Sequence, residues 1–330
     1  MRIAVLMVCA VVATLVWAMV PKTPASEAEA VRESSAGPLA VEKVADDLDT
    51  PWGLAFLPDG EMLVTELGGT LWLLHDDGTR SRVRGLPPVE QIGQGGLMDV
   101  AAARDFAETR TIFFSYVAPD GGETRTTLAS ARLREDRPLL TDIHIMLEQE
   151  PAIRSSRHFG SRIVEADDGT VFLTIGDRTR RPMAQETGNT IGKVLRVNRD
   201  GSIPADNPFA DGGGHPAVWS WGHRNPQGAA VDAEGRIWTV SHGARGGDEV
   251  NRPEKGANYG WPEVSYGTHY SGREFPASSR PGTVQPLHYW DPSIAPSGMM
   301  IYSGKLWPDW EGDVFVGALK YRLISRLERE

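Results

Sequence analysis

The sequence predicts an all-β fold and, more narrowly, a β-propeller in which small sheets radiate from one axis. A strand–turn–strand pattern recurs, with Asp-Gly or Glu-Gly turns joining an apolar strand to one rich in β-branched and aromatic residues. Glycine (36) and proline (23) are abundant, as many turns require. Strong helical periodicity is missing, and radial repetition is one of the few ways in which 330 residues of β structure hide their strand edges.

Five copies of this pattern define the expected blades. Three are clear and two are weaker, and in chain order they cover residues 54–65, 99–114, 163–174, 230–240 and 309–316. Their turns fall near residues 60, 107, 169, 235 and 312. This irregular spacing is blade-sized, because a four-stranded blade takes about 40–50 residues plus its loops. A β-sandwich, or two stacked β domains, is the alternative arrangement.

Composition limits the function classes. A formal net charge of −10 argues against nucleic acid as a partner, since a phosphate-binding surface needs a basic balance. The one cysteine, Cys9, lies in the apolar N-terminal segment. A chain cleaved after that segment would have no disulfide, no catalytic thiolate and no zinc site built on cysteine.

The N-terminus is typical of a secretory signal. Arg2 precedes an apolar run over residues 3–20, and small residues follow it. We therefore expect a signal peptide over residues 1–25, a disordered leader over 26–38 and the propeller domain over 39–330. The expected location is the periplasm or the exterior, with no membrane contact after cleavage. An uncleaved N-terminal anchor is the alternative, because the run is about long enough to span a bilayer.

Three polar clusters flank the repeat strands and are candidates for chemistry. They cover residues 157–162 around His158, residues 222–228 around Arg224, and the glycine-rich segment 241–251. Each has a bland reading: a structural histidine, a polar loop that bonds its own backbone, and a flexible turn capped by Asp248. Propellers build their sites from such loops, so three clusters in these positions favour one shared site. Glycine-rich backbone beside carboxylates also suits Ca²⁺, which prefers oxygen ligands.

These segments resemble the soluble PQQ-dependent aldose sugar dehydrogenases of the glucose/sorbosone dehydrogenase family. The similarity extends from about residue 40 to the end, and Gly-His-Arg-Asn-Pro-Gln-Gly is its most specific string. The matching runs are residues 50–56, 94–97, 158–162, 174–177, 192–196, 222–228, 258–262, 294–297 and 318–320. The resemblance implies a six-bladed β-propeller that binds PQQ and Ca²⁺ on one face and oxidises aldoses at the anomeric carbon to lactones.

The resemblance also assigns the catalytic residues. His158 is implied as the general base that takes the proton of the anomeric hydroxyl while hydride leaves the carbon. Asp248 is implied as the carboxylate that pairs with His158 and raises its basicity. Arg224 is implied as the cation that stabilises the negative charge growing on the quinone oxygen.

Cofactor and substrate contacts follow from the same resemblance. Asn225 and Lys320, together with Arg224, are implied for the polar and carboxylate edge of PQQ. Ser293 stands where the family has a hydroxyl residue. Gln94 and Gln227 are assigned to the substrate side.

Two calcium positions are implied as well. Gly243 and Ala244 would offer backbone carbonyls to the Ca²⁺ that polarises PQQ. The family often has proline where Ala244 stands, a change that keeps the carbonyl but loosens the loop. Glu249 and the Tyr259 carbonyl resemble a second, structural calcium site.

The sequence departs from the family pattern at its end, just after the strand that carries Lys320. The family continues with a further repeat whose loop supplies two arginines to the PQQ carboxylates. We therefore expect an incomplete last blade and poor PQQ affinity, since two lost charge-assisted contacts cost about 1.5–3 kcal/mol each. Calorimetric titration with PQQ and Ca²⁺ tests this expectation, and tight binding contradicts it.

Two other functions stay open. A Ca²⁺-dependent lactonase propeller uses similar metal ligands but needs no quinone, so PQQ-dependent dye reduction with an aldose separates the two. A non-catalytic binding propeller is the second, and it would be favoured if His158→Ala changed no measurable property. The preferred aldose, the electron acceptor and the oligomeric state, including a homodimer, are left open.

Overall fold

A computed structural model describes residues 30–329, which fall into two compact units, one ending at Asp47 and one beginning at Leu48. The predicted signal peptide over 1–25, the start of the leader and Cys9 lie outside the described residues. Within the first unit, β1 (Ala30–Arg32) pairs with β2 (Leu39–Val41) as an antiparallel hairpin. This differs from the disordered leader predicted over 26–38. The reason is local: Ser34 and Gly37 exchange backbone hydrogen bonds, and Gly37 has the positive φ of +95° that this turn needs.

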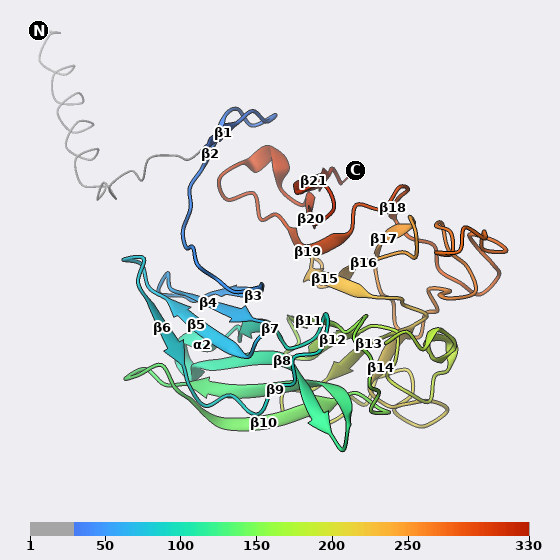
Figure 1. Ribbon diagram of the computed structural model, residues 1–330, viewed down its shortest axis with the longest axis horizontal. Coiled ribbons are helices and arrows are strands. Elements are labelled where there is room, and N and C mark those ends of the chain that lie inside the picture. Colours follow the sequence, from blue (N-terminus) through green and yellow to red (C-terminus); the bar gives the residue numbers. More distant parts are fainter. Residues whose placement is uncertain (1–29, 330) are drawn as a thin grey trace, which may run out of the picture. The chain divides into compact units, whose positions relative to one another are not determined.

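The second unit is an all-β propeller with five sheets among its described residues. Figure 1 shows strands β3, β7, β11, β15 and β19 nearest a common centre, with the later strands of each sheet farther out. Four sheets have four antiparallel strands each. The first has β3 (Pro51–Phe56), β4 (Met62–Glu66), β5 (Thr70–Leu74) and β6 (Arg80–Val83). The second has β7 (Leu97–Ala102), β8 (Thr111–Asp120), β9 (Glu123–Leu133) and β10 (Leu140–Glu148).

The remaining sheets follow in chain order. The third has β11 (Gly160–Glu165), β12 (Val171–Ile175), β13 (Lys193–Val197) and β14 (Val218–Trp221). The fourth has β15 (Pro226–Val231), β16 (Ile237–Ser241), β17 (Asp248–Asn251) and β18 (His288–Trp290). The fifth has three described strands, β19 (Pro296–Ile301), β20 (Val314–Ala318) and β21 (Leu323–Leu327). The sixth blade, like the incomplete last blade, stays a prediction.

The five predicted turns join the first two strands of the five sheets. In β3–β4, β11–β12 and β15–β16 the same pair of backbone hydrogen bonds closes the turn, for example Ala166 N to Thr170 O (2.9 Å) and Gly169 N to Ala166 O (3.1 Å). The turn glycine, such as Gly169 at φ +78°, adopts a conformation that other residues rarely take. In β7–β8 the short helix α2 (Phe106–Thr109) replaces the tight turn. Two 3₁₀ turns, Arg181–Gln185 and Pro308–Trp310, complete the described elements.

Apolar side chains between successive sheets form the core. One buried cluster joins the first two sheets through residues such as Leu71 and Phe114, and another joins the second and third through Phe113 and Leu173. Polar ties reinforce this packing near the centre. Buried Asp99 of β7 accepts hydrogen bonds from Arg162 Nη1 (2.7 Å) and Ile163 N (2.8 Å) of β11. Central strands fixed in this way give the loops at their ends defined positions.

Candidate active site

A pair formed by a histidine and an aspartate lies where the third sheet begins. His158 immediately precedes β11 and Asp177 follows β12, so the antiparallel pairing of β11 and β12 brings the two loops together. His158 Nδ1 lies 2.6 Å from Asp177 Oδ1. The Asp177 side chain is fully buried, whereas 13% of the His158 side chain is exposed. The geometry therefore aims an accessible imidazole outward from a buried carboxylate.

The protonation of this pair follows from its surroundings. Burial raises the pKa of Asp177, but the hydrogen bond and charge of His158, together with Arg224, more than offset this and hold it below its usual value. An ionised carboxylate only accepts hydrogen bonds, so Nδ1 of His158 carries the proton that joins them. Nε2 is then the basic nitrogen of the neutral ring, as a general base requires.

Asp248 was wrong as the predicted partner of His158. Its fully buried carboxylate accepts four hydrogen bonds elsewhere: from Gly243 N (2.8 Å) at Oδ1, and from Ser293 Oγ (2.6 Å), Ile294 N (2.8 Å) and Ala295 N (3.0 Å) at Oδ2. The acceptor sites of Asp248 are thus used to join the glycine-rich loop to the segment before β19. Asp177 stands in the run 174–177, where a carboxylate directly after a buried strand was the signal that could have found it.

Arg224 lies beside this pair. Asp177 N donates to Arg224 O (2.7 Å), and Trp261 Nε1 donates to Asp177 Oδ2 (2.8 Å) while the Arg224 guanidinium lies 5.3 Å from the Trp261 ring centre. Arg224 Nη1 donates to His242 O (3.2 Å) and Nη2 to the Tyr270 hydroxyl (3.2 Å), but its buried Nε has no hydrogen-bond partner. Burial lowers the pKa of Arg224 from its ordinary value. A buried cation with an unused donor fits an oxygen-bearing ligand.

The amide residues predicted for the site lie next to the same strands. Asn225 Oδ1 accepts from Gly160 N (3.1 Å) and from Gln227 Nε2 (3.3 Å), which holds Asn225 against the start of β11. Gln94 Oε1 accepts from His158 N (2.9 Å), so exposed Gln94 supports the loop that carries the base. The structure therefore brings Gln94, Asn225 and Gln227 to the surroundings of His158.

The glycine-rich loop offers unused acceptors. Among the described residues, no hydrogen bond engages the backbone carbonyls of Gly243 or Ala244. A Cβ on Gly243 would overlap the carbonyl oxygens of Gly246 and Gly247, so only glycine fits there. A tight turn with free carbonyls has the donor type that Ca²⁺ prefers.

Lys320 is the predicted site residue that the structure ties least to the others. It is exposed, and its Nζ lies 4.9 Å from the ring centre of Tyr321. Its backbone nitrogen donates to Ile294 O (3.2 Å), which joins it to the segment held by Asp248 and Ser293. Within the described residues, the Lys320 ammonium makes no hydrogen bond with any other predicted site residue.

The residues predicted for a second calcium site line a small cavity of about 10 Å³, enough for one water-sized sphere. Glu249, Asn251 and Tyr259 line it. Removal from water raises the pKa of Glu249 to about 7, and buried Asn251 Oδ1 has no hydrogen-bond partner. Among residues 30–329, no group of three or more His, Cys, Asp or Glu could hold a metal ion. The oxygen donors of this cavity include an amide and backbone carbonyls, which are not of those types.

A buried arginine that the sequence reasoning missed supports the His158 loop. Arg178, 0% exposed, donates from Nη1 to Gln149 Oε1 (2.6 Å) and from Nη2 to Thr124 Oγ1, Ile153 O and Ser155 O (3.1 Å each). Its guanidinium also lies 3.7 Å from the ring centre of Phe159. Burial lowers the pKa of Arg178 to about 9, which leaves it charged at neutral pH. The Arg178 side chain therefore holds the segment that leads into His158.

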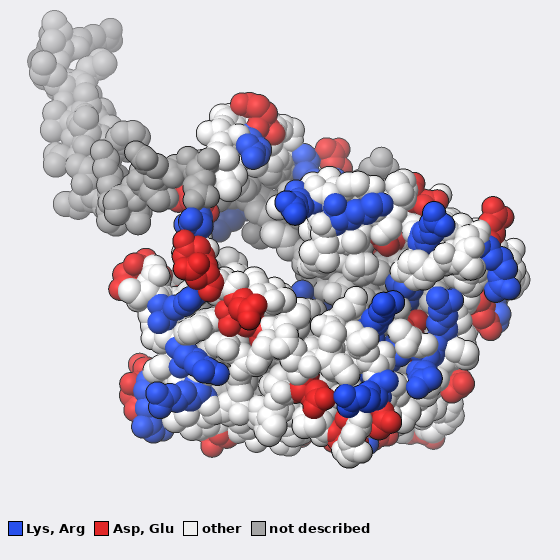
Figure 2. Space-filling view, in the orientation of Figure 1, with Lys and Arg blue, Asp and Glu red and all other residues white. Residues whose placement is uncertain are grey.

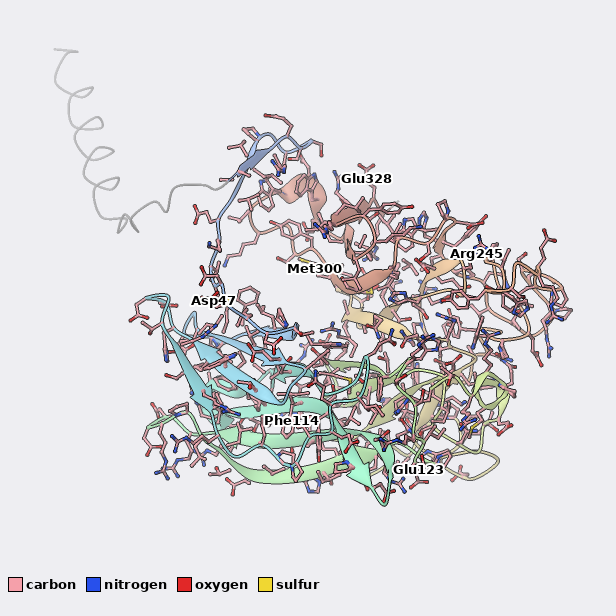
Figure 3. The ribbon with its side chains drawn as sticks, viewed as in Figure 1. Asp47, Phe114, Glu123, Arg245, Met300 and Glu328 are labelled. Carbon is pink, nitrogen blue, oxygen red and sulfur yellow. The ribbon has the colours of Figure 1, made fainter. Side chains whose placement is uncertain are left out.

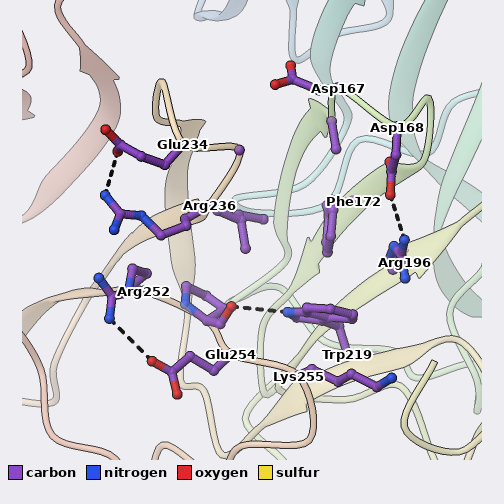
Figure 4. A pocket seen from close by; sticks show the side chains of 14 residues that line it. Asp167, Asp168, Phe172, Arg196, Trp219, Glu234, Arg236, Arg252, Glu254 and Lys255 are labelled. Carbon is purple, nitrogen blue, oxygen red and sulfur yellow. Dashed lines mark hydrogen bonds and ion pairs between the residues drawn. The ribbon is translucent and has the colours of Figure 1, made fainter. Parts of the chain in front are cut away.

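A larger cavity, of about 560 Å³, lies elsewhere (Figure 4). Residues of the β11–β12 and β15–β16 turns line it, beside Trp219, whose Nε1 donates to Pro253 O (3.0 Å). Those turns are at the opposite ends of the strands from His158 and Arg224, and the cavity contains none of the predicted site residues. This cavity therefore does not coincide with the candidate active site.

The fold and this site together define a class: a β-propeller that carries a buried carboxylate, an accessible histidine and a buried arginine at one end of its inner strands. The comparisons specify it further. The sequence model of the family "Glucose / Sorbosone dehydrogenase" matches residues 48–330, and the chain belongs to that family. Aldose sugar dehydrogenase YliI of Escherichia coli (strain K12) is 42% identical over 289 residues, covering 85% of this chain and 78% of the relative.

Solved structures agree with this assignment. The apo-form crystal structure of the soluble aldose sugar dehydrogenase from Escherichia coli has a TM-score of 0.84 at 40% identity, covering 88% of this chain and 86% of that one. The PQQ-bound aldose sugar dehydrogenase from Streptomyces coelicolor has a TM-score of 0.74 at 26% identity, covering 91% and 81%. These comparisons confirm the predicted membership of the glucose/sorbosone dehydrogenase family.

Proposed function

We propose that this protein oxidises aldoses at the anomeric carbon to lactones, with PQQ and Ca²⁺ as bound cofactors. The observation that carries the proposal is the 2.6 Å contact of His158 Nδ1 with buried Asp177, which leaves Nε2 as the basic nitrogen of a partly exposed ring. Membership of the family supports the substrate class, and the PQQ-bound relative supports the cofactor.

The protein's own groups account for the proton. Nε2 of His158 accepts the proton of the anomeric hydroxyl, and the ionised Asp177 stabilises the imidazolium that results. Asp177 also fixes the ring orientation, because it holds Nδ1 while Trp261 holds its other oxygen. Bound PQQ would supply the acceptor for the hydride of the anomeric carbon.

The residues present fit such a cofactor. Arg224, with its unpartnered Nε, and Asn225 would contact the quinone edge, while Lys320 would reach a carboxylate and Ser293 would add a hydroxyl. The free carbonyls of Gly243 and Ala244 would hold the adjacent Ca²⁺, and the cavity at Glu249 and Tyr259 would hold a structural one. Gln94 and Gln227 would contact the sugar.

The location is also a proposal. The charged start and the apolar run over residues 3–20 support export to the periplasm or the exterior, with an N-terminal anchor as the alternative. Among the described residues, no helix is long and apolar enough to cross a membrane. Cell fractionation of the full chain, with N-terminal sequencing of the recovered protein, distinguishes a cleaved signal from a retained anchor.

Reconstitution tests the proposed activity. The chain is purified without cofactor and assayed by dye reduction with a panel of aldoses, with PQQ and Ca²⁺ added together and singly. We expect reduction only when both are present, and loss of it in His158→Ala. Dye reduction without PQQ, or none with any aldose at saturating PQQ and Ca²⁺, contradicts the proposal.

A further inference from the structure

Five arginines stand around the candidate site without an acidic partner. Arg157, Arg180, Arg245 and Arg273 are exposed and Arg181 is half-buried. None of the five forms an ion pair with a described carboxylate, although most arginines elsewhere in the described chain do. Unpaired cations are informative in a chain whose formal net charge is −10. We name these five residues the arginine rim.

Contacts on the His158 side connect the first two members of the rim. Ser155 Oγ lies 3.4 Å from Thr179 Oγ1, which places the loop of Arg157 against the loop of Arg180. Arg180 N donates to the carbonyl of Asp177 (2.6 Å), the residue that holds His158. Arg157 and Arg180 therefore flank the proposed base.

The next two members meet at one histidine. Arg181 Nη1 lies 3.3 Å from His269 Nδ1, and His269 N donates to Arg273 O (2.8 Å). Loss of solvation and the charges of Arg273 and Arg181 lower the pKa of His269 from its ordinary value. The Arg181 guanidinium also lies 5.3 Å from the Trp261 ring centre, on the wall that holds Arg224. The charges here are close to the site.

Arg245 closes the rim on the glycine-rich loop. Thr268 N donates to Arg245 O (3.2 Å), and Arg245 directly follows Gly243 and Ala244. Exposed Glu186, Glu274 and Asp291 share these loops without an ion pair to a described residue, and the five rim arginines outnumber them. The exposed carboxylates of Glu254 and Glu263 pair with Arg252 and Arg280. Figure 2 shows Lys and Arg side chains gathered over the part of the unit where Figure 1 places β13, β14 and β17. Figure 3 labels Arg245 among the loops in that region.

We propose that the arginine rim docks a one-electron redox protein through a cluster of carboxylates on that protein, and that this protein takes the electrons of the sugar. The inference rests on the proposed function. Each aldose converted to a lactone releases two electrons and two protons, so two acceptor molecules each take one electron and the protons pass to water. The rim spans loops of the third and fourth sheets, including the segment 268–273. Opposite charge on the partner would steer its approach and orient it over the site.

Cytochrome c and its succinylated form make a matched pair of probes, because one haem protein is compared with its lysines positive and with the same lysines carrying carboxylates. The protein loaded with PQQ and Ca²⁺ is reduced with an aldose and mixed with each probe in a stopped-flow instrument. We expect succinylated cytochrome c to be reduced about tenfold faster at low ionic strength, with the difference disappearing as salt rises. The overall charge of −10 works against this result, so it isolates the rim.

Charge-reversal variants assign the effect to the rim. Arg180→Glu with Arg273→Glu should slow the succinylated probe several-fold. Arg273→Glu alone should slow it less and leave the reduction of the loaded protein by aldose unchanged. The control is Arg82→Glu with Arg84→Glu, two exposed arginines at β6, far along the chain from the site. Faster reduction of native cytochrome c, rates independent of salt, or equal effects of the two double variants overturns the proposal.

A binding measurement separates this inference from the proposed function. Sedimentation of the cofactor-free chain with succinylated cytochrome c at low salt needs no turnover. Association that the Arg180/Arg273 variant weakens and the Arg82/Arg84 variant does not supports docking, even if aldose fails to reduce the loaded protein. Absence of association at low salt contradicts docking, whatever the activity.

Discussion

The loops of the third and fourth sheets differ sharply from the fifth-sheet region that carries Lys320. At His158, Asp177 and Arg224, hydrogen bonds to other loops hold the imidazole, both carboxylate oxygens and two guanidinium nitrogens. At Lys320 the side chain is exposed, and only its backbone joins the network through Ile294. The difference teaches that one half of the candidate site is fixed by the fold alone, whereas the other half has freedom that a ligand would have to restrict.

Replacing the proposed base should give the largest effect. His158→Ala removes the group that accepts the proton, and we expect aldose-dependent dye reduction to fall about 10²–10⁴-fold. The matched control is His144→Ala, because His144 is exposed and bonds only the carbonyl of Asp200 (3.0 Å). Steady-state rates with PQQ and Ca²⁺ at saturation measure both. Equal activity of the two variants contradicts the assignment.

Removing the buried Arg178 side chain should give the second largest effect. Arg178→Met removes the guanidinium donors from Gln149, Thr124 and two backbone carbonyls, and we expect a loss of about 3 kcal/mol in the free energy of unfolding. Urea unfolding of the cofactor-free chain measures it. Arg104→Met, at a side chain 52% exposed, is the control and should change stability by about 0.5 kcal/mol or less. Arg178→Lys should recover part of the difference, since Lys keeps the charge but has fewer donors.

The two carboxylates separate catalysis from loop structure. Asp177→Asn should lower kcat on the order of 10²-fold, because an amide no longer favours the Nδ1-protonated ring. Asp248→Asn should instead weaken Ca²⁺ binding, since Asp248 holds the loop of Gly243 and leaves His158 untouched. Rates at saturating Ca²⁺ and calcium titrations of both variants test this. A larger loss of kcat in Asp248→Asn than in Asp177→Asn would instead favour Asp248 as the partner of His158.

Acid stability gives a further distinction for Asp177. Its folded-state pKa lies below the unfolded value of about 3.9, so its ionisation adds stability that is fully present above roughly pH 5. That stability is lost as pH falls through the folded-state pKa. Wild type should therefore lose more stability than Asp177→Asn between pH 5 and the acid limit of folding. Urea midpoints over this range measure it, and parallel curves contradict the expectation.

Lys320 should give the smallest effect. Lys320→Gln should change the free energy of unfolding by about 0.5 kcal/mol or less, because the side chain is exposed. PQQ affinity should fall about tenfold, the value of one charge-assisted hydrogen bond. Lys305→Gln, at another exposed lysine, should change neither. Thermal unfolding and PQQ titration measure the pair, and unchanged PQQ affinity in Lys320→Gln removes this residue from the site.

The sequence could predict what depends on neighbours along the chain. The turns at Asp168-Gly169 and Glu234-Gly235 follow from local chemistry, and the recurrence of such turns indicates the propeller. The partner of His158 depends instead on which of two loops its ring faces. Asp177 and Asp248 both stand at strand ends, and only the pairing of β11 with β12 decides between them. Arg178 was missed for a similar reason, because nothing local shows that a charged side chain turns inward to the carbonyls of residues 153 and 155.

The separation of the strand ends has a practical consequence. The β11–β12 and β15–β16 hairpins carry site residues at one end and a tight turn at the other, and an exposed turn of the same kind joins β3 to β4 at Asp59-Gly60. A flexible peptide spliced into that turn would hang from the side remote from the sugar. The chain could thus be attached to an electrode or a fusion partner at this turn while the candidate active site stays accessible.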